Sequence, residues 1–146
     1  MDSDSNLKLN SQLCFPLYAC AKEVVKQYTP FLEKIGLTYT QYIAMMVMWE
    51  HKSLNVKEIG ELLYLDSGTL TPLLKRLESR GLIERKRSET DERRLYVTIT
   101  DKGELLKEKA NEVSHEVRKC INLSPQEIIF LQRILHNILD QVTTKN

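Results

Sequence analysis

The segment from Asn55 to Ile83, NVKEIGELLYLDSGTLTPLLKRLESRGLI, constrains the fold more than any other part of the chain. Its pattern predicts two short helices joined by a tight turn, the first over about 56–63. Apolar residues mark the side of each helix that we expect to be buried: Val56, Ile59, Leu62 and Leu63 in the first, and Leu70, Leu73, Leu74 and Leu77 in the second. Asp66 or Ser67 is expected to cap the second helix and Gly81 to end it, with Pro72 in or just after its first turn.

The sequence period changes directly after this helix pair. LIERKRS and RLYVTIT are rich in residues that favour strands, and the polar stretch ETDER separates them. We therefore expect a hairpin of two strands. Between Lys75 and Arg94, eight Lys or Arg outnumber five Asp or Glu, although the net charge of the whole chain is only +1. The positive charge is thus concentrated on the second helix and the hairpin.

A helix pair followed by a charged hairpin is the layout of a winged helix-turn-helix that binds double-stranded DNA. The exposed face of the second helix carries Ser67, Thr69, Thr71, Lys75 and Arg76. Small hydroxyl side chains can approach base edges in the major groove, and the two basic residues suit phosphates. Arg93 and Arg94, at the hairpin tip, are candidates for a minor groove. The alternative is a solvated, charge-rich surface without a nucleic-acid partner.

Helices are expected on both sides of this module. A first helix should cover about 11–33, unless Pro16 moves its start to near Cys14 or bends it there. Thr38 or Thr40 should cap a buried helix through QYIAMMVMWEH, and Thr100 or Asp101 should begin a long helix to about Ile121. SPQE at 124–127 is a capping box that opens the last helix. The expected apolar sides are Leu13, Leu17, Val24, Val25, Phe31 and Leu32, then Leu105, Leu106, Ala110, Val113, Val117 and Cys120, and finally Ile128, Leu131, Ile134, Leu135, Ile138, Leu139 and Val142.

The fold class that follows is mainly α with a small β-hairpin wing, in a single domain of 146 residues. The helices at both chain ends are more apolar than a small module needs, so we expect them to pack against a second copy. In the resulting homodimer, 1–36 and 101–146 would form the dimerisation region, and 37–100 the winged helix-turn-helix. Two copies related by a twofold axis would span two half-sites of a pseudo-palindromic operator.

Composition excludes several other classes of protein. The opening MDSDSN has no basic and apolar signal-peptide regions, and no apolar run reaches the roughly 20 residues of a membrane span, so we expect a cytoplasmic protein. The three cysteines are an odd number without a CxxC pair, which argues against a disulfide framework or a zinc site. The histidines are scattered, and we expect neither a metal nor a cofactor.

Cys14 is a candidate reactive thiol. Peroxides react with the thiolate, which the positive end of a helix favours, and Cys14 lies near an expected helix start. Tyr18 is four residues further on, on the same helix face, where its hydroxyl can donate a hydrogen bond to the sulfur. The alternative is that Cys14 is an ordinary core residue, because cysteine is among the most frequently buried residue types.

The stretch from Leu65 to Gly103 resembles the MarR family of bacterial transcriptional regulators. The pattern SxxDERxxxVxxTxxG, from Ser88 to Gly103, is its most specific signature. The stretch QLCFPLYACAKEVVKQYTPFLEKIGLTYTQY is similar to the branch that senses organic hydroperoxides. This likeness runs from about Gln12 to Leu106. The resemblance implies a repressor, not an enzyme, with an organic hydroperoxide or related oxidant as its signal.

The resemblance also implies roles for particular residues. Cys14 matches the peroxide-reactive cysteine and Tyr18 a tyrosine on the same helix, while Tyr28 and Tyr39 match tyrosines that reach the thiol from the partner subunit. In the DNA-binding region the matching positions are Asp66, Ser67, Thr69 and Arg76 on the recognition helix, and Asp91 and Arg93 on the wing, the acid orienting the base. The chain departs from the family pattern at Pro16 and at Cys20.

Members of this branch with two cysteines carry a second thiol in the C-terminal helical region of the partner. Cys120 fits that position, and the resemblance implies that it forms a disulfide with oxidised Cys14 of the other subunit. Cys20 lies nearly opposite Cys14 on the helix and is expected to be structural. Two alternatives remain: a MarR-type repressor released by a small aromatic ligand, with incidental cysteines, and a thiol peroxidase with Cys14 as nucleophile.

Overall fold

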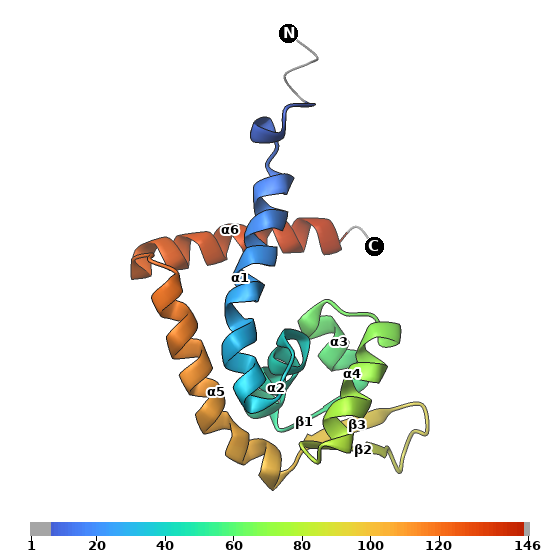
Figure 1. Ribbon diagram of the computed structural model, residues 1–146. Coiled ribbons are helices and arrows are strands. Elements are labelled where there is room, and N and C mark those ends of the chain that lie inside the picture. Colours follow the sequence, from blue (N-terminus) through green and yellow to red (C-terminus); the bar gives the residue numbers. More distant parts are fainter. Residues whose placement is uncertain (1–6, 145–146) are drawn as a thin grey trace.

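The computed structural model describes residues 7–144, which form six α-helices and three short strands (Figure 1). The opening MDSDSN, for which no signal peptide is expected, and residues 145–146 lie outside this part. The helices are α1 (Cys14–Ile35), α2 (Tyr39–His51), α3 (Val56–Leu63), α4 (Ser67–Ser79), α5 (Asp101–Cys120) and α6 (Pro125–Thr143). The strands are β1 (Ser53–Asn55), β2 (Ile83–Arg87) and β3 (Leu95–Ile99), and a 3₁₀ turn at Leu9–Ser11 precedes α1.

The helix pair α3–α4 lies where the sequence predicted it. The side chain of Asp66 accepts a hydrogen bond from the Thr69 N–H at 2.7 Å, so Asp66, not Ser67, caps α4. At the other end, the Leu82 N–H donates to the Leu77 carbonyl and the Gly81 N–H donates to the Glu78 carbonyl. This Schellman arrangement needs the positive φ of 72° that Gly81 adopts. Both ends of α4 are therefore fixed by local sequence.

One residue assigned to the buried side of α3 is misplaced. Leu62 is 48% exposed, whereas Ile59 is fully buried. Gly60 is also buried, and it lies so close to the Leu65 carbonyl oxygen that a Cβ atom there would be only 2.8 Å from it. This close approach turns the Ile59–Gly60 side of α3 inward, and Leu62, about 200° beyond Gly60, faces outward.

The two prolines of α1 lie in different environments. The helix begins at Cys14, so Pro16 is its third residue, where no helical hydrogen bond is lost. The first of the two expectations for Pro16 is thus confirmed, and the predicted start at about Ser11 is wrong. Pro30 lies in the interior of the helix and removes one hydrogen bond there. The helix ends at Ile35, and the next residue, Gly36, adopts a left-handed φ of 70°.

The predicted hairpin is confirmed, but it belongs to a larger sheet. Strand β3 pairs antiparallel with β2 on one side and with β1 on the other, in the order β1-β3-β2. Strand β1 has only three residues, and the Ser53 and Thr98 hydroxyls share a hydrogen bond of 2.9 Å across it. The central strand buries Val97 completely. The wing is therefore attached to the stretch between α2 and α3.

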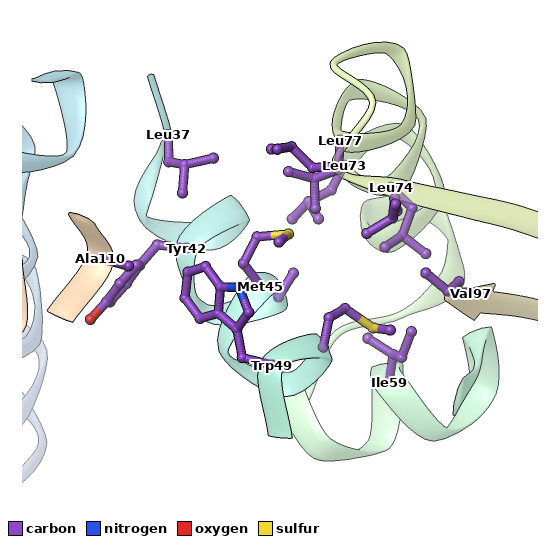
Figure 2. Close-up of a cluster of buried hydrophobic side chains, with 14 of the residues drawn as sticks. Leu37, Tyr42, Met45, Trp49, Ile59, Leu73, Leu74, Leu77, Val97 and Ala110 are labelled. Atoms are coloured by element: carbon purple, nitrogen blue, oxygen red, sulfur yellow. The ribbon is translucent and has the colours of Figure 1, made fainter. Parts of the chain in front are cut away.

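The core lies between α2, the helix pair and the sheet (Figure 2). All four leucines predicted to face inward from α4 are buried, and Met45 and Met48 of α2 are fully buried with them. Thr38 caps α2 in a capping box with Gln41. The indole N–H of Trp49 donates to the Gly103 carbonyl at 2.9 Å, which fastens α2 to the first turn of α5. The helix pair, the sheet and the start of α5 are thus one packed unit.

The outer helices are much less buried than the module. Among the described residues, α1 buries only Leu32 and α6 buries none of its side chains. Leu105 and Cys120 were expected on the apolar side of α5, but both are exposed: Leu105 lies beside the buried stripe of Ala110, Val113 and Val117, and Cys120 lies at the end of the helix. The apolar side chains at the start of α1 and most of those on α6 therefore have little cover within one subunit.

Candidate nucleic-acid interface and thiol site

Helix α4 presents a polar face at the surface of the module. Ser67, Thr69, Lys75 and Arg76 are exposed, and Thr71 is half-buried. Asp66 lies just before them, and its hydrogen bonds with Thr69 hold the pKa of its carboxyl below the ordinary value. The carboxylate is thus engaged in capping the helix, while the hydroxyls and the two basic side chains stay accessible. A face of small donors and cations is suited to a DNA groove.

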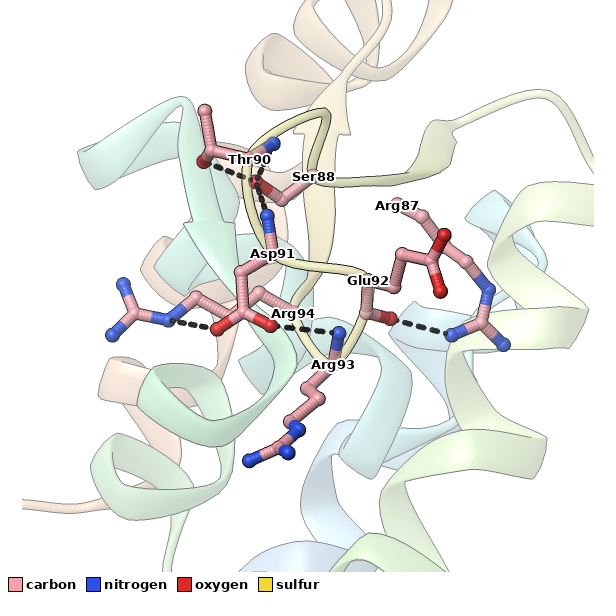
Figure 3. A network of polar contacts seen from close by, with 7 residues as sticks. All are labelled: Arg87, Ser88, Thr90, Asp91, Glu92, Arg93 and Arg94. Atoms are coloured by element: carbon pink, nitrogen blue, oxygen red, sulfur yellow. Dashed lines mark hydrogen bonds and ion pairs between the residues drawn. The ribbon is translucent and has the colours of Figure 1, made fainter.

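The tip of the wing is held by hydrogen bonds within its own turn (Figure 3). The Ser88 hydroxyl accepts from the N–H groups of Thr90 and Asp91 at 3.2 and 3.3 Å. Asp91 Oδ1 accepts from the Arg93 N–H at 3.0 Å, and Asp91 Oδ2 lies 3.7 Å from Arg94 Nε. The carboxylate therefore fixes the main chain at Arg93 and pairs with Arg94, and the Arg93 guanidinium points away from the turn (Figure 3).

Arg85, one of the arginines of the positive segment, is paired with an acid inside the module. Arg85 donates from its backbone N–H and its guanidinium to Glu78 of α4, at 3.0 to 3.2 Å. This contact holds the pKa of Glu78 below its ordinary value, and the Arg85 side chain is only 17% exposed. Arg85 thus joins β2 to α4. The basic residues left accessible are those of the α4 face and the wing.

The three thiols are free and exposed. Cys14 is the first residue of α1, and Tyr18 follows one turn later with 64% of its surface exposed. Among the hydrogen bonds of residues 7–144, none joins Cys14 to Tyr18. Cys20 was expected to be structural, but its exposure excludes packing in the core of the subunit. Cys120 ends α5, and its Sγ lies 3.8 Å from the Glu116 carbonyl.

Three tyrosines form a cluster where α1 meets α2. The rings of Tyr28 and Tyr39 lie 5.1 Å apart, and the ring of Tyr42 lies 5.7 and 6.3 Å from them. Burial raises the pKa of all three hydroxyls, so they keep their protons and can donate hydrogen bonds at neutral pH. Tyr42 was not predicted from the sequence, although its spacing of three residues from Tyr39 places both on one helix face.

The tyrosine cluster is far from the thiol of its own subunit. Cys14 and Tyr28 are fourteen residues apart on one helix, which separates them by about 21 Å along its axis. Next to Tyr28, a groove of about 760 Å³ lies between the end of α5 and the mainly apolar face of α6. Its wall includes Ile121, the neighbour of Cys120. Tyr28 and the Cys120 end of α5 thus border the same hollow.

The described residues give no sign of a metal centre or a membrane span. No group of three or more His, Cys, Asp or Glu side chains within 7–144 is arranged to hold a metal ion. None of the helices in that range is long and apolar enough to cross a bilayer.

Comparison with known proteins identifies the family. A family model described as transcriptional regulator SarA/Rot matches residues 26–110. The organic hydroperoxide resistance transcriptional regulator of Bacillus subtilis is 48% identical over 141 residues, which cover 97% of this chain and 96% of that protein. The regulator SarZ of Staphylococcus aureus is 41% identical over 136 residues, 93% of this chain and 92% of that protein.

Solved structures of AbfR from Staphylococcus epidermidis share the fold. Reduced AbfR bound to DNA superposes with a TM-score of 0.82 at 30% identity, covering 99% of this chain and 98% of that one. Overoxidised AbfR, also bound to DNA, gives 0.78 at 33% identity over 95% and 98% of the two chains. Disulfide-formed AbfR gives 0.66 at 34% identity over 93% and 96%. The resemblance inferred from the sequence is confirmed: the chain belongs to the MarR-type transcriptional regulators, in the group described by the SarA/Rot family model.

Proposed function

We propose that the protein is an oxidation-sensing repressor that binds a pseudo-palindromic DNA operator as a reduced homodimer. Residues 1–36 and 101–146 form the dimerisation region in this proposal, and 37–100 the DNA-binding region. Oxidation of Cys14 and its bonding to the partner subunit's Cys120 release the DNA. The observation that carries the proposal is the separation of about 21 Å between Cys14 and the Tyr28 cluster on one α1 helix, because only a second copy can bring them together.

The uncovered apolar surface supports the dimer. Leu13, just before α1, is exposed, as are Phe15 and Leu17 in its first turns, and α6 exposes Ile128, Ile129, Phe130, Leu131 and Ile134. A monomer would leave this surface in water at considerable cost. The groove beside Tyr28 has the apolar lining needed to receive the start of the partner's α1. In that arrangement, the partner's Cys14 would lie near both Tyr28 and Cys120.

The chemistry proceeds in two balanced steps. The Cys14 thiolate attacks the terminal oxygen of an organic hydroperoxide, and the O–O bond breaks to give a sulfenic acid and an alkoxide, which takes a proton from water to become the alcohol. The partner subunit's Cys120 thiol then attacks this sulfur, so that a disulfide forms and water leaves. Tyr28 and Tyr39 keep their hydroxyl protons and can stabilise the thiolate before the first step.

Helix α5 can carry this change to the DNA-binding region. It has 20 residues, about 30 Å in length, with the wing strand β3 just before its start and Cys120 at its end. Trp49 fastens its first turn to α2, so a displacement of the Cys120 end would rotate the module. The DNA-bound structures of AbfR include an overoxidised form, which favours the disulfide, rather than oxygen added to the sulfur, as the releasing step.

The direct test compares Cys14→Ser with Cys20→Ser as the matched control on the same helix. Each reduced protein is bound to a duplex selected from a random-sequence pool and then treated with cumene hydroperoxide. We expect Cys14→Ser to bind DNA and stay bound, and Cys20→Ser to be released like wild type. Release of Cys14→Ser would contradict the proposal. Consumption of many peroxide equivalents per thiol would instead indicate a peroxidase.

A further inference from the structure

The C-terminal ends of α1 and α4 meet at one side chain, that of Arg80. Arg80 directly follows the last residue of α4. Its guanidinium donates one hydrogen bond to the Gly36 carbonyl and a second, of 3.3 Å, to the Ile35 carbonyl. These carbonyls lie at the end of α1, where helical partners are lacking and the helix dipole is negative. A cation with two donors in a fixed plane is therefore well matched to this helix end.

The C-terminal ends of α1 and α4 approach each other closely at Gly36. A Cβ atom built on Gly36 would lie 2.9 Å from Arg80 Nη2 and 3.3 Å from its Cζ. The left-handed φ of 70° at Gly36 turns the chain away from the helix axis. The guanidinium thus lies directly against the backbone of the α1 terminus, and Arg80 is only half-buried there.

The same turn of α4 is held from a second side by α5. The Arg80 carbonyl accepts a hydrogen bond of 2.8 Å from Lys102 Nζ. The Gly81 carbonyl accepts one of 2.6 Å from the Thr100 hydroxyl, and the Leu82 carbonyl accepts one of 3.1 Å from the Thr100 N–H. The end of the recognition helix is therefore tied to the helix that begins with Cys14 and to the helix that ends with Cys120.

We propose that Arg80 is a positioning residue for DNA binding, which sets the orientation of α4 against α1 through the Ile35 and Gly36 carbonyls. This deepens the proposed function and rests on it: a shift of α1 reaches α4 through the guanidinium. Arg80 is at the opposite end of α4 from Ser67 and Thr69. Its effect on affinity is therefore indirect.

Three variants of the full chain test this assignment. Arg80→Ala removes both hydrogen bonds to α1. Arg80→Lys keeps the charge, but its ammonium lacks the planar pair of donors. Ser79→Ala is the matched control, because the Ser79 hydroxyl donates only within α4, to the Arg76 carbonyl at 2.8 Å.

Hydrogen exchange of the reduced proteins measures whether the Arg80 hydrogen bonds stabilise the end of α1. We expect peptides covering 33–37 to exchange faster in Arg80→Ala than in wild type, with Arg80→Lys in between and Ser79→Ala unchanged. Equal exchange at the α1 terminus in Arg80→Ala and wild type would overturn the proposal.

Salt-dependent DNA binding separates positioning from direct contact. For Arg80→Ala we expect about tenfold weaker binding to the selected duplex and an unchanged slope of log affinity against log salt. A phosphate contact would instead lower the slope by about 0.9, and Arg80→Lys would then bind like wild type. That pattern, or wild-type affinity in Arg80→Ala, would overturn the proposal.

Treating the DNA-bound proteins with hydroperoxide distinguishes failure of this inference from failure of the proposed function. If wild type stays on DNA after hydroperoxide treatment, the redox proposal fails, and the exchange and affinity of the reduced Arg80 variants still decide the role of Arg80. If Arg80→Ala matches wild type while wild type is released, only the inference about Arg80 fails. A wild-type protein that binds no duplex would overturn both.

Discussion

Tyr28 and Tyr39 pack edge to face with ring centroids 5.1 Å apart, although one belongs to α1 and the other to α2. The left-handed turn at Gly36 and the capping box at Thr38 bring the two helices together at this point. Edge-to-face packing fixes the directions in which both hydroxyls point. Tyr28 also lines the apolar groove beside α6, so under the proposed function its hydroxyl would be in position to meet a thiolate supplied by another subunit.

Tyr28→Phe is expected to slow the oxidation of Cys14. Removing one hydroxyl removes a hydrogen bond that favours the thiolate, and losing a hydrogen bond to a charged group, worth about 1.5 kcal/mol, gives about tenfold less of the reactive species. The rate of thiol loss with cumene hydroperoxide, measured in a Cys20→Ser, Cys120→Ser background, gives the effect. Tyr96→Phe, on the wing strand β3, is the control and should react at the parent rate. Equal rates in all three proteins would rule out a role for Tyr28.

Arg76 and Arg85 are expected to behave differently in DNA binding, although both belong to the positive segment. Arg76 is exposed on α4, whereas Arg85 is paired with Glu78. Arg76→Ala should reduce the slope of log affinity against log salt by about 0.9, the value for one phosphate contact. Arg85→Ala should leave that slope unchanged. The reverse result would place the DNA on the β2 side of α4.

Asp91 is expected to act through the shape of the wing. Asp91→Asn keeps an oxygen that can accept from the Arg93 N–H, whereas Asp91→Ala removes it. Affinity for the selected duplex should fall several-fold in Asp91→Ala and change little in Asp91→Asn, and fluorescence anisotropy measures both. If Asp91→Asn loses as much affinity as Asp91→Ala, the ion pair with Arg94 is the important contact.

The Glu78–Arg85 pair predicts a pH dependence of stability. The pKa of Glu78 is lowered from 4.5 in the folded protein, so its contribution is present above that value and is lost as the pH falls through the folded pKa. Urea unfolding at a fixed protein concentration should show Glu78→Gln less stable than wild type at pH 7, with the difference shrinking as the pH falls below 4.5. Glu84→Gln, an exposed neighbour, should show no such trend. A difference that stays as large in acid as at pH 7 would contradict this explanation.

The DNA-binding module could be predicted because its signals are local. The apolar spacing of α3, the cap at Asp66, the leucines of α4 and the Gly81 turn determine both helices within a few residues of sequence. Strand β1 could not be predicted in this way, since three residues show no alternation and its partner β3 is about 40 residues away. The contact of Arg80 with the end of α1 was missed for the same reason, because its partners are about 45 residues away and leave no periodic pattern.

The outer helices show a different limit. Helical spacing correctly predicted an apolar face for α6, but it could not tell whether that face packs inside the subunit or against another one, and the structure leaves it uncovered. The thiol site has the same property. Cys14, Tyr28 and Cys120 were all named from the sequence, and the fold separates Cys14 from Tyr28 within one chain.

The most direct test mixes two kinds of subunit, both with Cys20→Ser. One retains only Cys14 and the other only Cys120, so a bond between these two thiols can form only across a mixed dimer. After the subunits exchange and cumene hydroperoxide is added, a non-reducing gel with peptide mass spectrometry should show a Cys14–Cys120 linked pair in the mixture and in neither protein alone, together with loss of DNA binding. A mixture that releases DNA without forming that linkage would contradict the proposed switch.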